Sequence, residues 1–299
     1  MCHPAADPVG IGTAIGHHGE VLQGAIEGPD RRLQRCLVTL PCPLAQSKAH
    51  FYPQAGAELT VHPAWKVKSL QAARLVAAAA GRPGVGGCLT VDTPVPARWG
   101  FGSSTSDVIA AVRAVAAALN YAVSPDDVAR LAVEAETASD STMFGHRAVL
   151  FAQREGAVLE DLGGRLPRAL VVGFNTDRSG YGVDTLNLPP ARYSWQEIEL
   201  FRPMLGLLRR AVREGDPVLL GRVTTASARV SQRHLPKPHF DEFERLVERA
   251  GALGLQVSHS GSLVGLLFDP STPALAERVG EARCFIDGLG FGPTWEFTT

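Results

Sequence analysis

The residues with the clearest chemical potential form a glycine- and serine-rich loop in the first half of the chain. Its sequence is Pro96-Ala97-Arg98-Trp99-Gly100-Phe101-Gly102-Ser103-Ser104-Thr105-Ser106-Asp107. The two glycines let the backbone turn where side chains would clash, so that successive N–H groups can converge on one point. The hydroxyls of Ser103, Ser104 and Thr105 can bind phosphate oxygens or Mg²⁺. A tight turn with a serine cap has the same sequence, so the loop alone leaves both interpretations open.

A helix is predicted directly behind this loop. Val108, Val112, Val115 and Leu119 recur at spacings of four, three and four, which places them on one helical face. Ser104 and Asp107 have the spacing of a capping box at its start. The unpaired N–H groups of the first turn and the positive end of the helix dipole favour a bound anion. Loop and helix together predict a site for a di- or triphosphate.

The loop resembles the phosphate loop of the GHMP kinases, a family named for galactokinase, homoserine kinase, mevalonate kinase and phosphomevalonate kinase. The shared pattern Pro-x-x-x-Gly-x-Gly-Ser-Ser is formed by Pro96, Gly100, Gly102, Ser103 and Ser104, with Phe101 where many members carry leucine. Thr105-Ser106 replaces the Ala-Ala that is common in the family, and here the chain looks more like the bacterial L-threonine kinases of cobamide synthesis. Segments 16–24 (GHHGEVLQG) and 258–266 (SHSGSLVGL) are similar to two further motifs of that branch. The resemblance implies that residues Pro96 and Gly100 to Thr105 bind ATP.

Segment 134–141 resembles the Glu-x-x-x-Asp-Ser pattern of threonine kinases. By that resemblance Glu136 and Ser104 would bind Mg²⁺, and Asp140 would act on the acceptor hydroxyl as a base or an orienting group. Such carboxylates are needed because phosphoryl transfer depends on positioning and charge neutralisation. The alternative is a solvated acidic helix end followed by a turn, which is the favoured interpretation for Glu134.

Several residues in the remaining motifs are candidates for contact with the acceptor. Glu20 could bind a substrate ammonium, or it could be a surface charge on a strand. His17 and His18 replace the Thr-Cys of threonine kinases and leave the identity of the acceptor open. The serine-glycine turn at 260–262 could close over the substrates or form an ordinary hairpin, and His259 is interpreted as structural. The expected substrate-binding residues are Glu20, His18, Asp184, Thr185, Ser260, Gly261 and Ser262.

The elements that must position these residues are a mixture of strands and helices, which predicts an α+β fold. Strands are expected as short pieces in 35–62, where Pro41, Pro43 and Pro53 interrupt the pattern, and at 88–92, 148–152, 157–159, 168–174, 255–258, 263–268 and 282–286. Helices are expected at 65–80, from 104 onward, at 124–138, 195–213, 216–229 and 239–250. The resemblance implies two domains, a ribosomal-S5-like ATP-binding domain at 1–165 and a ferredoxin-like domain at 166–299.

Composition and charge exclude several other classes. The 299 residues carry a net charge of -1, so no basic surplus favours nucleic acid or an anionic membrane. Five scattered cysteines without a CxxC pair predict free thiols in a reducing compartment, and the first residues lack the pattern of a signal peptide. We therefore expect a cytoplasmic protein without a membrane or nucleic-acid partner, and a homodimer is among the assemblies that the sequence allows.

The interpretation that best fits the sequence is an ATP- and Mg²⁺-dependent small-molecule kinase, with L-threonine as the favoured acceptor. Another hydroxy amino acid or small alcohol is the alternative. Two other classes are less favoured. A nicotinamide-dependent oxidoreductase would rest on Gly10, Gly12 and Gly16, which lack the preceding strand of a dinucleotide-binding loop. A serine hydrolase would use Ser260 or Ser104, but no GxSxG elbow is present.

Overall fold

The computed structural model describes residues 8–28, 32–96, 98–179, 181–182 and 191–299. The strands of this part of the chain are β1 (Gly10–Glu27), β2 (Leu33–Pro53), β3 (Leu59–His62), β4 (Gly87–Asp92), β5 (Arg147–Ala152), β6 (Ala157–Arg165), β7 (Leu170–Asn175), β8 (Gly254–Val257), β9 (Leu263–Phe268) and β10 (Trp295–Thr298). The helices are α1 (Val67–Ala79), α2 (Ser103–Ala118), α3 (Pro125–Glu136), α4 (Trp195–Glu214), α5 (Pro217–Ser231), α6 (Phe240–Arg249) and α7 (Leu275–Gly288), with a short 3-10 turn η1 (Thr142–Phe144).

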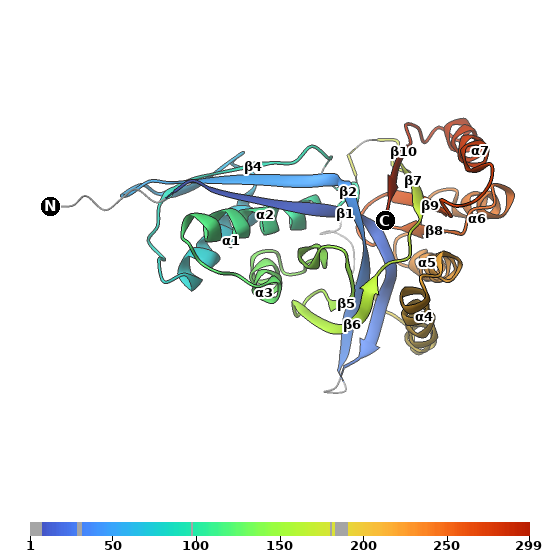
Figure 1. The fold of residues 1–299 in the computed structure, drawn as a ribbon, viewed down its shortest axis with the longest axis horizontal. Coiled ribbons are helices and arrows are strands. Elements are labelled where there is room, and N and C mark those ends of the chain that lie inside the picture. Colours follow the sequence, from blue (N-terminus) through green and yellow to red (C-terminus); the bar gives the residue numbers. More distant parts are fainter. Residues whose placement is uncertain (1–7, 29–31, 97, 180, 183–190) are drawn as a thin grey trace.

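Two long antiparallel strands, β1 and β2, run through the N-terminal half (Figure 1). The expectation of several short strands in 35–62 is wrong, because β2 runs through Pro41 and Pro43 without ending. The pairing with β1 shifts register between Ile15 and Gly16, where Gln46 gives way to Cys42 as the partner. The strand therefore bulges around Pro43, and a bulge is a place where a sheet accommodates a proline.

Helix α2 packs on β1 closely enough to require glycine. A Cβ at Gly12 would lie 2.1 Å from the carbonyl oxygen of Ala110, and one at Gly10 would lie 1.9 Å from that of Ala114. On the other side of the contact, the predicted apolar face of α2 is fully buried at Val112. The glycines that superficially suggested a dinucleotide loop therefore lie in a strand and make room for a helix.

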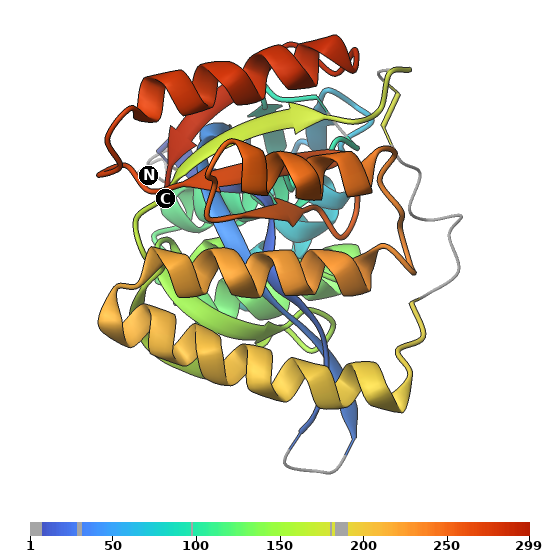
Figure 2. The same ribbon diagram turned by 90° about the vertical axis from the view of Figure 1, so that its right-hand side faces the viewer.

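The C-terminal half combines four antiparallel strands with a layer of helices. The strands lie in the order β10-β7-β9-β8, which is the 4-1-3-2 order of a ferredoxin-like sheet. Helices α4 to α7 lie side by side over this half (Figure 2). The strand expected at 282–286 is wrong, because these residues belong to α7, in which Val279, Ala282 and Ile286 are buried at helical spacing.

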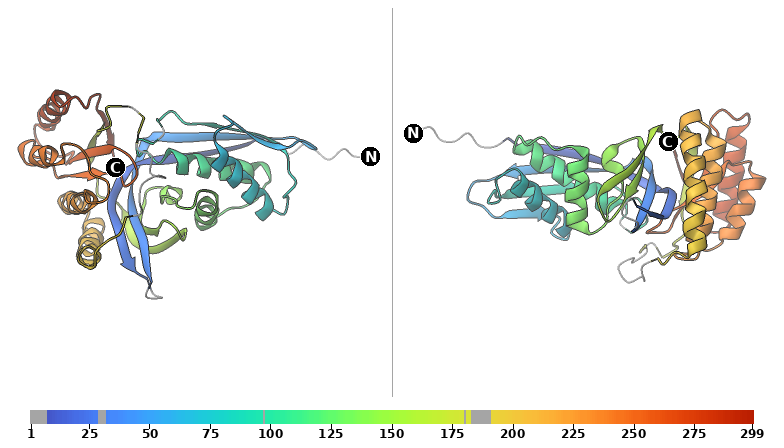
Figure 3. Two further views of the ribbon diagram at one scale, coloured as in Figure 1. Left: turned by 180° about the vertical axis from the view of Figure 1, so that it is seen from behind. Right: turned by 90° about the horizontal axis from the view of Figure 1, so that it is seen from below.

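One sheet connects the two halves. Glu20 of β1 pairs with Val257 of β8, so the strands of the C-terminal half continue the sheet of the N-terminal half. Figure 3 shows the two halves from behind and from below, with the helix layer at one end. The predicted boundary between residues 165 and 166 falls between β6 and β7 and stays a prediction. Within the described ranges, no helix is long and apolar enough to cross a membrane.

Candidate active site

The glycine-serine loop, residues 96–104, meets the start of α2 in a backbone conformation that needs glycine. Gly100 and Gly102 have φ angles of +111° and +64°, a region that side-chain-bearing residues rarely adopt. Gly102 is the N-cap of α2 and no side chain caps this helix end. The capping box expected between Ser104 and Asp107 is wrong, because Asp107 is paired with Lys66 instead. The first-turn N–H groups of α2 therefore stay available to an anion.

The turn between β8 and β9 is fixed directly against this loop. Ser262 and Leu263 both donate backbone hydrogen bonds to the carbonyl oxygen of Trp99, at 2.8 and 3.1 Å. A Cβ at Gly261 would lie 2.3 Å from the same oxygen, and one at Gly100 would lie 2.6 Å from Cβ of Ser258. The glycine-serine loop and segment 258–266 are thus in backbone contact, and glycine is required on both sides.

Ser104, Thr105 and Glu136 form an oxygen-rich group at the start of α2. Ser104 Oγ donates to Glu136 Oε2 at 2.8 Å, and Thr105 Oγ1 donates to Glu136 Oε1 at 2.7 Å. Burial raises the pKa of Glu136 to about 7, although both hydroxyls and Lys68, 3.8 Å away, favour its charged form. A buried carboxylate beside hydroxyls is a donor set that suits Mg²⁺, because this hard cation prefers oxygen ligands. The predicted pair of Mg²⁺ ligands is therefore brought together, and its role stays a prediction.

Asp140 lies in a buried chain of alternating acids and histidines. His17 Nε2 lies 2.8 Å from Asp140 Oδ2, and its Nδ1 lies 3.6 Å from Glu20 Oε1. Glu20 accepts from His259 twice, from the backbone N–H and from Nδ1, both at 2.8 Å. These four residues come from β1, the segment after α3 and the β8–β9 turn, so the contacts join segments 16–24, 134–141 and 258–266.

The pairing fixes the charges within this chain of residues. Burial alone would disfavour an imidazolium, but Asp140 and Glu20 raise the pKa of His17 to about 9. Burial would likewise raise the pKa of Asp140, but the charge and hydrogen bond of His17 lower it to about 2. Both groups are therefore charged at neutral pH. The imidazole of His17 also packs on the loop, since a Cβ at Gly102 would lie 2.1 Å from its Cδ2.

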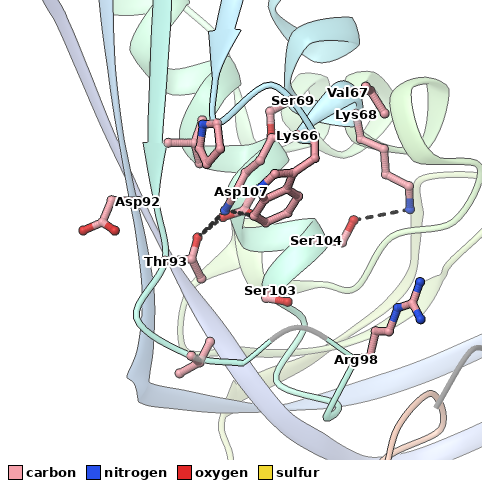
Figure 4. A pocket seen from close by; sticks show the side chains of 14 residues that line it. Lys66, Val67, Lys68, Ser69, Asp92, Thr93, Arg98, Ser103, Ser104 and Asp107 are labelled. Carbon is pink, nitrogen blue, oxygen red and sulfur yellow. Dashed lines mark hydrogen bonds and ion pairs between the residues drawn. The ribbon is translucent and has the colours of Figure 1, made fainter. Parts of the chain in front are cut away.

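A pocket of about 510 Å³ opens on one side of the glycine-serine loop (Figure 4). Its lining includes Arg98, Ser103 and Ser104 from the loop region, and the exposed indole of Trp65 from the start of α1. Lys66 and Asp107 also line this pocket, and Lys66 Nζ lies 2.6 Å from Asp107 Oδ2. Thr93 forms hydrogen bonds with both side chains. The volume lies in the range of small-molecule and cofactor sites, about 300–1,000 Å³.

A smaller pocket of about 230 Å³ lies beside the β8–β9 turn. It is lined by Gly261 and Ser262 of that turn, by residues 176–177 and Gly182 after β7, and by 235–238 between α5 and α6. Gly261 and Ser262 contact Trp99 and Gly100, so the turn that lines the smaller pocket lies against the loop that lines the larger one.

The other predicted residues differ in burial and in their contacts. Pro96 is exposed, whereas Phe101 is buried against His18 and Trp295. His18 is fully buried, and burial lowers its pKa to about 3, so the ring is neutral. It lines neither pocket, and its contact with a substrate stays a prediction, as does that of Glu20, whose two oxygens are already bonded to His259.

Asp184 and Thr185 lie outside the described residues, and Ser260 lies in the β8–β9 turn beside Gly261. Within the described part of the chain, Ser104 and Ser260 have no bonded histidine that could activate them as nucleophiles. The serine-hydrolase interpretation therefore gains no support.

Three features of the site were missed from the sequence. The pairing of His17 with Asp140 spans 123 positions and the pairing of Lys66 with Asp107 spans 41, so no local spacing indicates either. Lys237 lines the smaller pocket from a connection between helices. Its position between Pro236 and Pro238 was the available signal, because two prolines hold the backbone on both sides of the lysine.

Comparisons with known proteins identify the family of the chain. The family model of the GHMP kinases N terminal domain matches residues 67–148, and that of the GHMP kinases C terminal domain matches residues 208–284, so together they cover more than half of the chain. An L-threonine kinase from Salmonella typhimurium is 31% identical over 191 residues, which are 64% of this chain and 63% of that protein. The match thus spans less than two thirds of the curated relative.

Solved structures show the same fold at low sequence identity. The homoserine kinase from Cytophaga hutchinsonii has a TM-score of 0.70 at 16% identity, covering 100% of this chain and 96% of that one. The structure of MDDEF in complex with MVAPP, AMPPCP and magnesium has a TM-score of 0.65 at 15% identity, covering 97% of each chain. The predicted two-domain α+β fold is confirmed, and the chain belongs to the GHMP kinases.

Proposed function

We propose that this protein transfers the γ-phosphoryl group of MgATP to the hydroxyl of a small metabolite, with L-threonine as the favoured acceptor and O-phospho-L-threonine as the product. The observation that carries the proposal is the arrangement around the glycine-serine loop. An uncapped helix start, a pair of Mg²⁺-type ligands and a buried ionised aspartate lie around the loop that lines the larger pocket and contacts the turn of the smaller one.

The larger pocket and the loop would hold the nucleotide. The N–H groups at the start of α2 would bind phosphate oxygens, because the positive end of the helix dipole favours an anion. Glu136 and Ser104 would hold Mg²⁺, which when bound neutralises charge on the phosphates. The raised pKa of Glu136 fits this role, since a buried carboxylate is stabilised in its charged form by a nearby cation. A protein of the same fold was solved with AMPPCP and magnesium, which supports the proposal that a magnesium nucleotide is the phosphoryl donor.

Asp140 would accept a hydrogen bond from the acceptor hydroxyl. Its ion pair with His17 keeps the carboxylate ionised but makes it a weak base. A weakly basic carboxylate would mainly orient the acceptor hydroxyl. The proton would pass to the carboxylate only as the hydroxyl oxygen bonds to phosphorus. His17 would act as a positioning residue, because its ring bonds to Asp140 and packs on Gly102.

The acceptor is proposed from the curated relative and from the sequence motifs. An L-threonine kinase matches about two thirds of this chain, and the glycine-serine loop continues into Thr105 as in that branch. His17 and His18 depart from the pattern of threonine kinases, so another hydroxy amino acid or small alcohol is the second candidate.

A screen of ATP consumption tests the proposal. Purified protein with MgATP is incubated with L-threonine, L-serine, L-homoserine and simple alcohols, and the release of ADP is followed. We expect acceptor-dependent ADP release that needs Mg²⁺ and is lost in Ser104→Ala with Glu136→Gln. ADP release that is the same with and without every acceptor would contradict the proposal.

A further inference from the structure

Lys237 is a buried cation without an anionic partner. Lys237 is 5% exposed, and its Nζ donates one hydrogen bond, to the carbonyl oxygen of Gly261 at 2.7 Å. No carboxylate of the described residues lies within ion-pair distance of this ammonium, whereas Lys66 pairs with Asp107 and Lys68 lies near Glu136. Two of its three N–H donors therefore have no bonded partner in the described part of the chain.

The burial of this ammonium is costly. Desolvation lowers the pKa of Lys237 to about 7, and the charge of Glu20 offsets only part of that change. A buried lysine is ordinarily paired, because an isolated charge loses its hydration without compensation. A carboxylate from a ligand would supply the missing anion.

A second polar group beside Lys237 also has no partner. The Oγ of Ser262 is buried and makes no hydrogen bond, although the backbone of the same residue is fully used by Trp99 and Thr176. A buried hydroxyl without a partner is uncommon in folded proteins. Ser262 and Lys237 line the same pocket, so two independent groups there are ready to bind an acceptor of hydrogen bonds.

The remaining lining of the smaller pocket limits what can enter it. Its volume of about 230 Å³ is below the range typical of drug-sized ligands, about 300–1,000 Å³. Asp177 is the other charged residue in the lining, and its oxygens already accept from Ser179 and from the backbone N–H of Gly182. A small ligand with one carboxylate therefore fits the charge of the pocket.

We infer that Lys237 and Ser262 bind the carboxylate of the phosphoryl acceptor, so that the enzyme selects a small hydroxy amino acid over the corresponding amino alcohol. The inference rests on the proposed function, because it assigns the smaller pocket to the acceptor. It names a specificity-determining residue outside the three sequence motifs and decides between the two acceptor classes that the sequence left open.

Matched ligand pairs test the inference by equilibrium binding. L-Threonine, L-serine and L-homoserine are compared by calorimetry with their decarboxylated counterparts 1-aminopropan-2-ol, ethanolamine and 3-aminopropan-1-ol. Charged hydrogen bonds predict that the best amino acid binds roughly 10- to 100-fold more tightly than its amino alcohol. Lys237→Met should remove this preference, Ser262→Ala should reduce it, and Lys237→Arg should retain part of it. Lys48→Met, at an exposed lysine of β2, is the matched control and should leave the preference unchanged.

A resonance measurement gives a second readout on the unmutated protein, in case Lys237→Met does not fold. The chain has only four lysines, at 48, 66, 68 and 237, so the side-chain signals of a lysine-labelled sample are few. The Lys237 signal should titrate near pH 7, and its midpoint should move upward when L-threonine binds, because a nearby carboxylate favours the ammonium. The amino alcohol should not move it.

Equal affinity for both members of every pair, an unchanged preference in Lys237→Met, or an unmoved Lys237 midpoint would each overturn the inference. Failure of all three amino acids to bind would also overturn it. The proposed function fails separately. Efficient phosphorylation of the amino alcohols would support the proposed kinase function and contradict the inference. Lys237-dependent binding of an amino acid without phosphoryl transfer would support the inference and contradict the proposed function.

Discussion

The two pockets beside the glycine-serine loop and its neighbouring turn differ in whether their buried lysines are paired with a carboxylate. In the larger pocket, Lys66 lies 2.6 Å from Asp107, whose other oxygen accepts from Ser47 at 2.8 Å. In the smaller pocket, Lys237 has only a carbonyl partner and Ser262 Oγ has none. Paired charges of the first kind belong to the architecture of the fold. Unpaired groups of the second kind reduce stability and are a mark of a site that is completed by its ligand.

The largest expected effect comes from breaking the paired charges of the larger pocket. Lys66→Met leaves Asp107 buried without its cation and should lower the free energy of unfolding by about 3–5 kcal/mol. Denaturant unfolding measures the change. Lys66→Met combined with Asp107→Leu should recover most of the loss, while Lys48→Met should stay within about 0.5 kcal/mol of wild type. A single Lys66→Met variant as stable as wild type would mean that the pair has no structural role.

A second expected effect concerns Asp140, whose charge is also paired but whose partner His17 lies against the loop. Asp140→Asn should lower kcat by roughly 100-fold or more, because the acceptor hydroxyl loses its charged hydrogen-bond acceptor. Steady-state kinetics at saturating substrates measures it, with the exposed Asp126→Asn as the control. A kcat near the wild-type value would show that the His17–Asp140 pair is structural, like the pair in the larger pocket.

A third prediction separates two neighbouring carboxylates of α3. Glu136→Gln should raise the Mg²⁺ concentration needed for half-maximal rate by roughly 10- to 100-fold, the range seen when support of a metal ligand is lost. Glu134→Gln should leave it unchanged, since Glu134 is exposed. Equal Mg²⁺ requirements in the two variants would remove Glu136 from the metal site.

The smallest expected effect has the opposite sign and tests the unpaired lysine by pH. Because the folded state lowers the pKa of Lys237 from 10.5 to about 7, the unfolded chain binds more protons between these values. The wild type therefore gains stability as pH rises from about 7 toward 10.5. Lys237→Met should stabilise the ligand-free protein on the order of 1 kcal/mol at pH 7 and less at pH 10. Thermal unfolding at both pH values measures the difference, and a variant that is equally destabilised at both would indicate a structural lysine.

The features that could be predicted from the sequence are the local ones. The helix after the loop, the capping box of Ser124 and Asp127 at the start of α3, and the apolar spacing of α4 follow from neighbours within one or two turns. The pattern of the glycine-serine loop placed Ser104 and Glu136 in one site through the family resemblance, and the structure brings them to 2.8 Å.

The features that could not be predicted depend on contacts between distant segments. Asp107 has the spacing of a cap, but it pairs with a lysine 41 positions away and does not cap the helix. The periodic residues of 279–286 fit a strand or a helix equally in a short window, and packing against β7 and its neighbours selects the helix. Lys237 lies in a connection whose place beside Gly261 is set only by the tertiary fold.

The most direct test of the central claim is to identify the product by mass spectrometry. The protein is incubated with L-threonine and ATP whose γ-phosphoryl group carries ¹⁸O. We predict O-phospho-L-threonine that contains the labelled phosphoryl group, formed in equal amount with ADP. Labelled inorganic phosphate as the sole phosphorylated product, across L-threonine, the other hydroxy amino acids and the simple alcohols, would contradict the account.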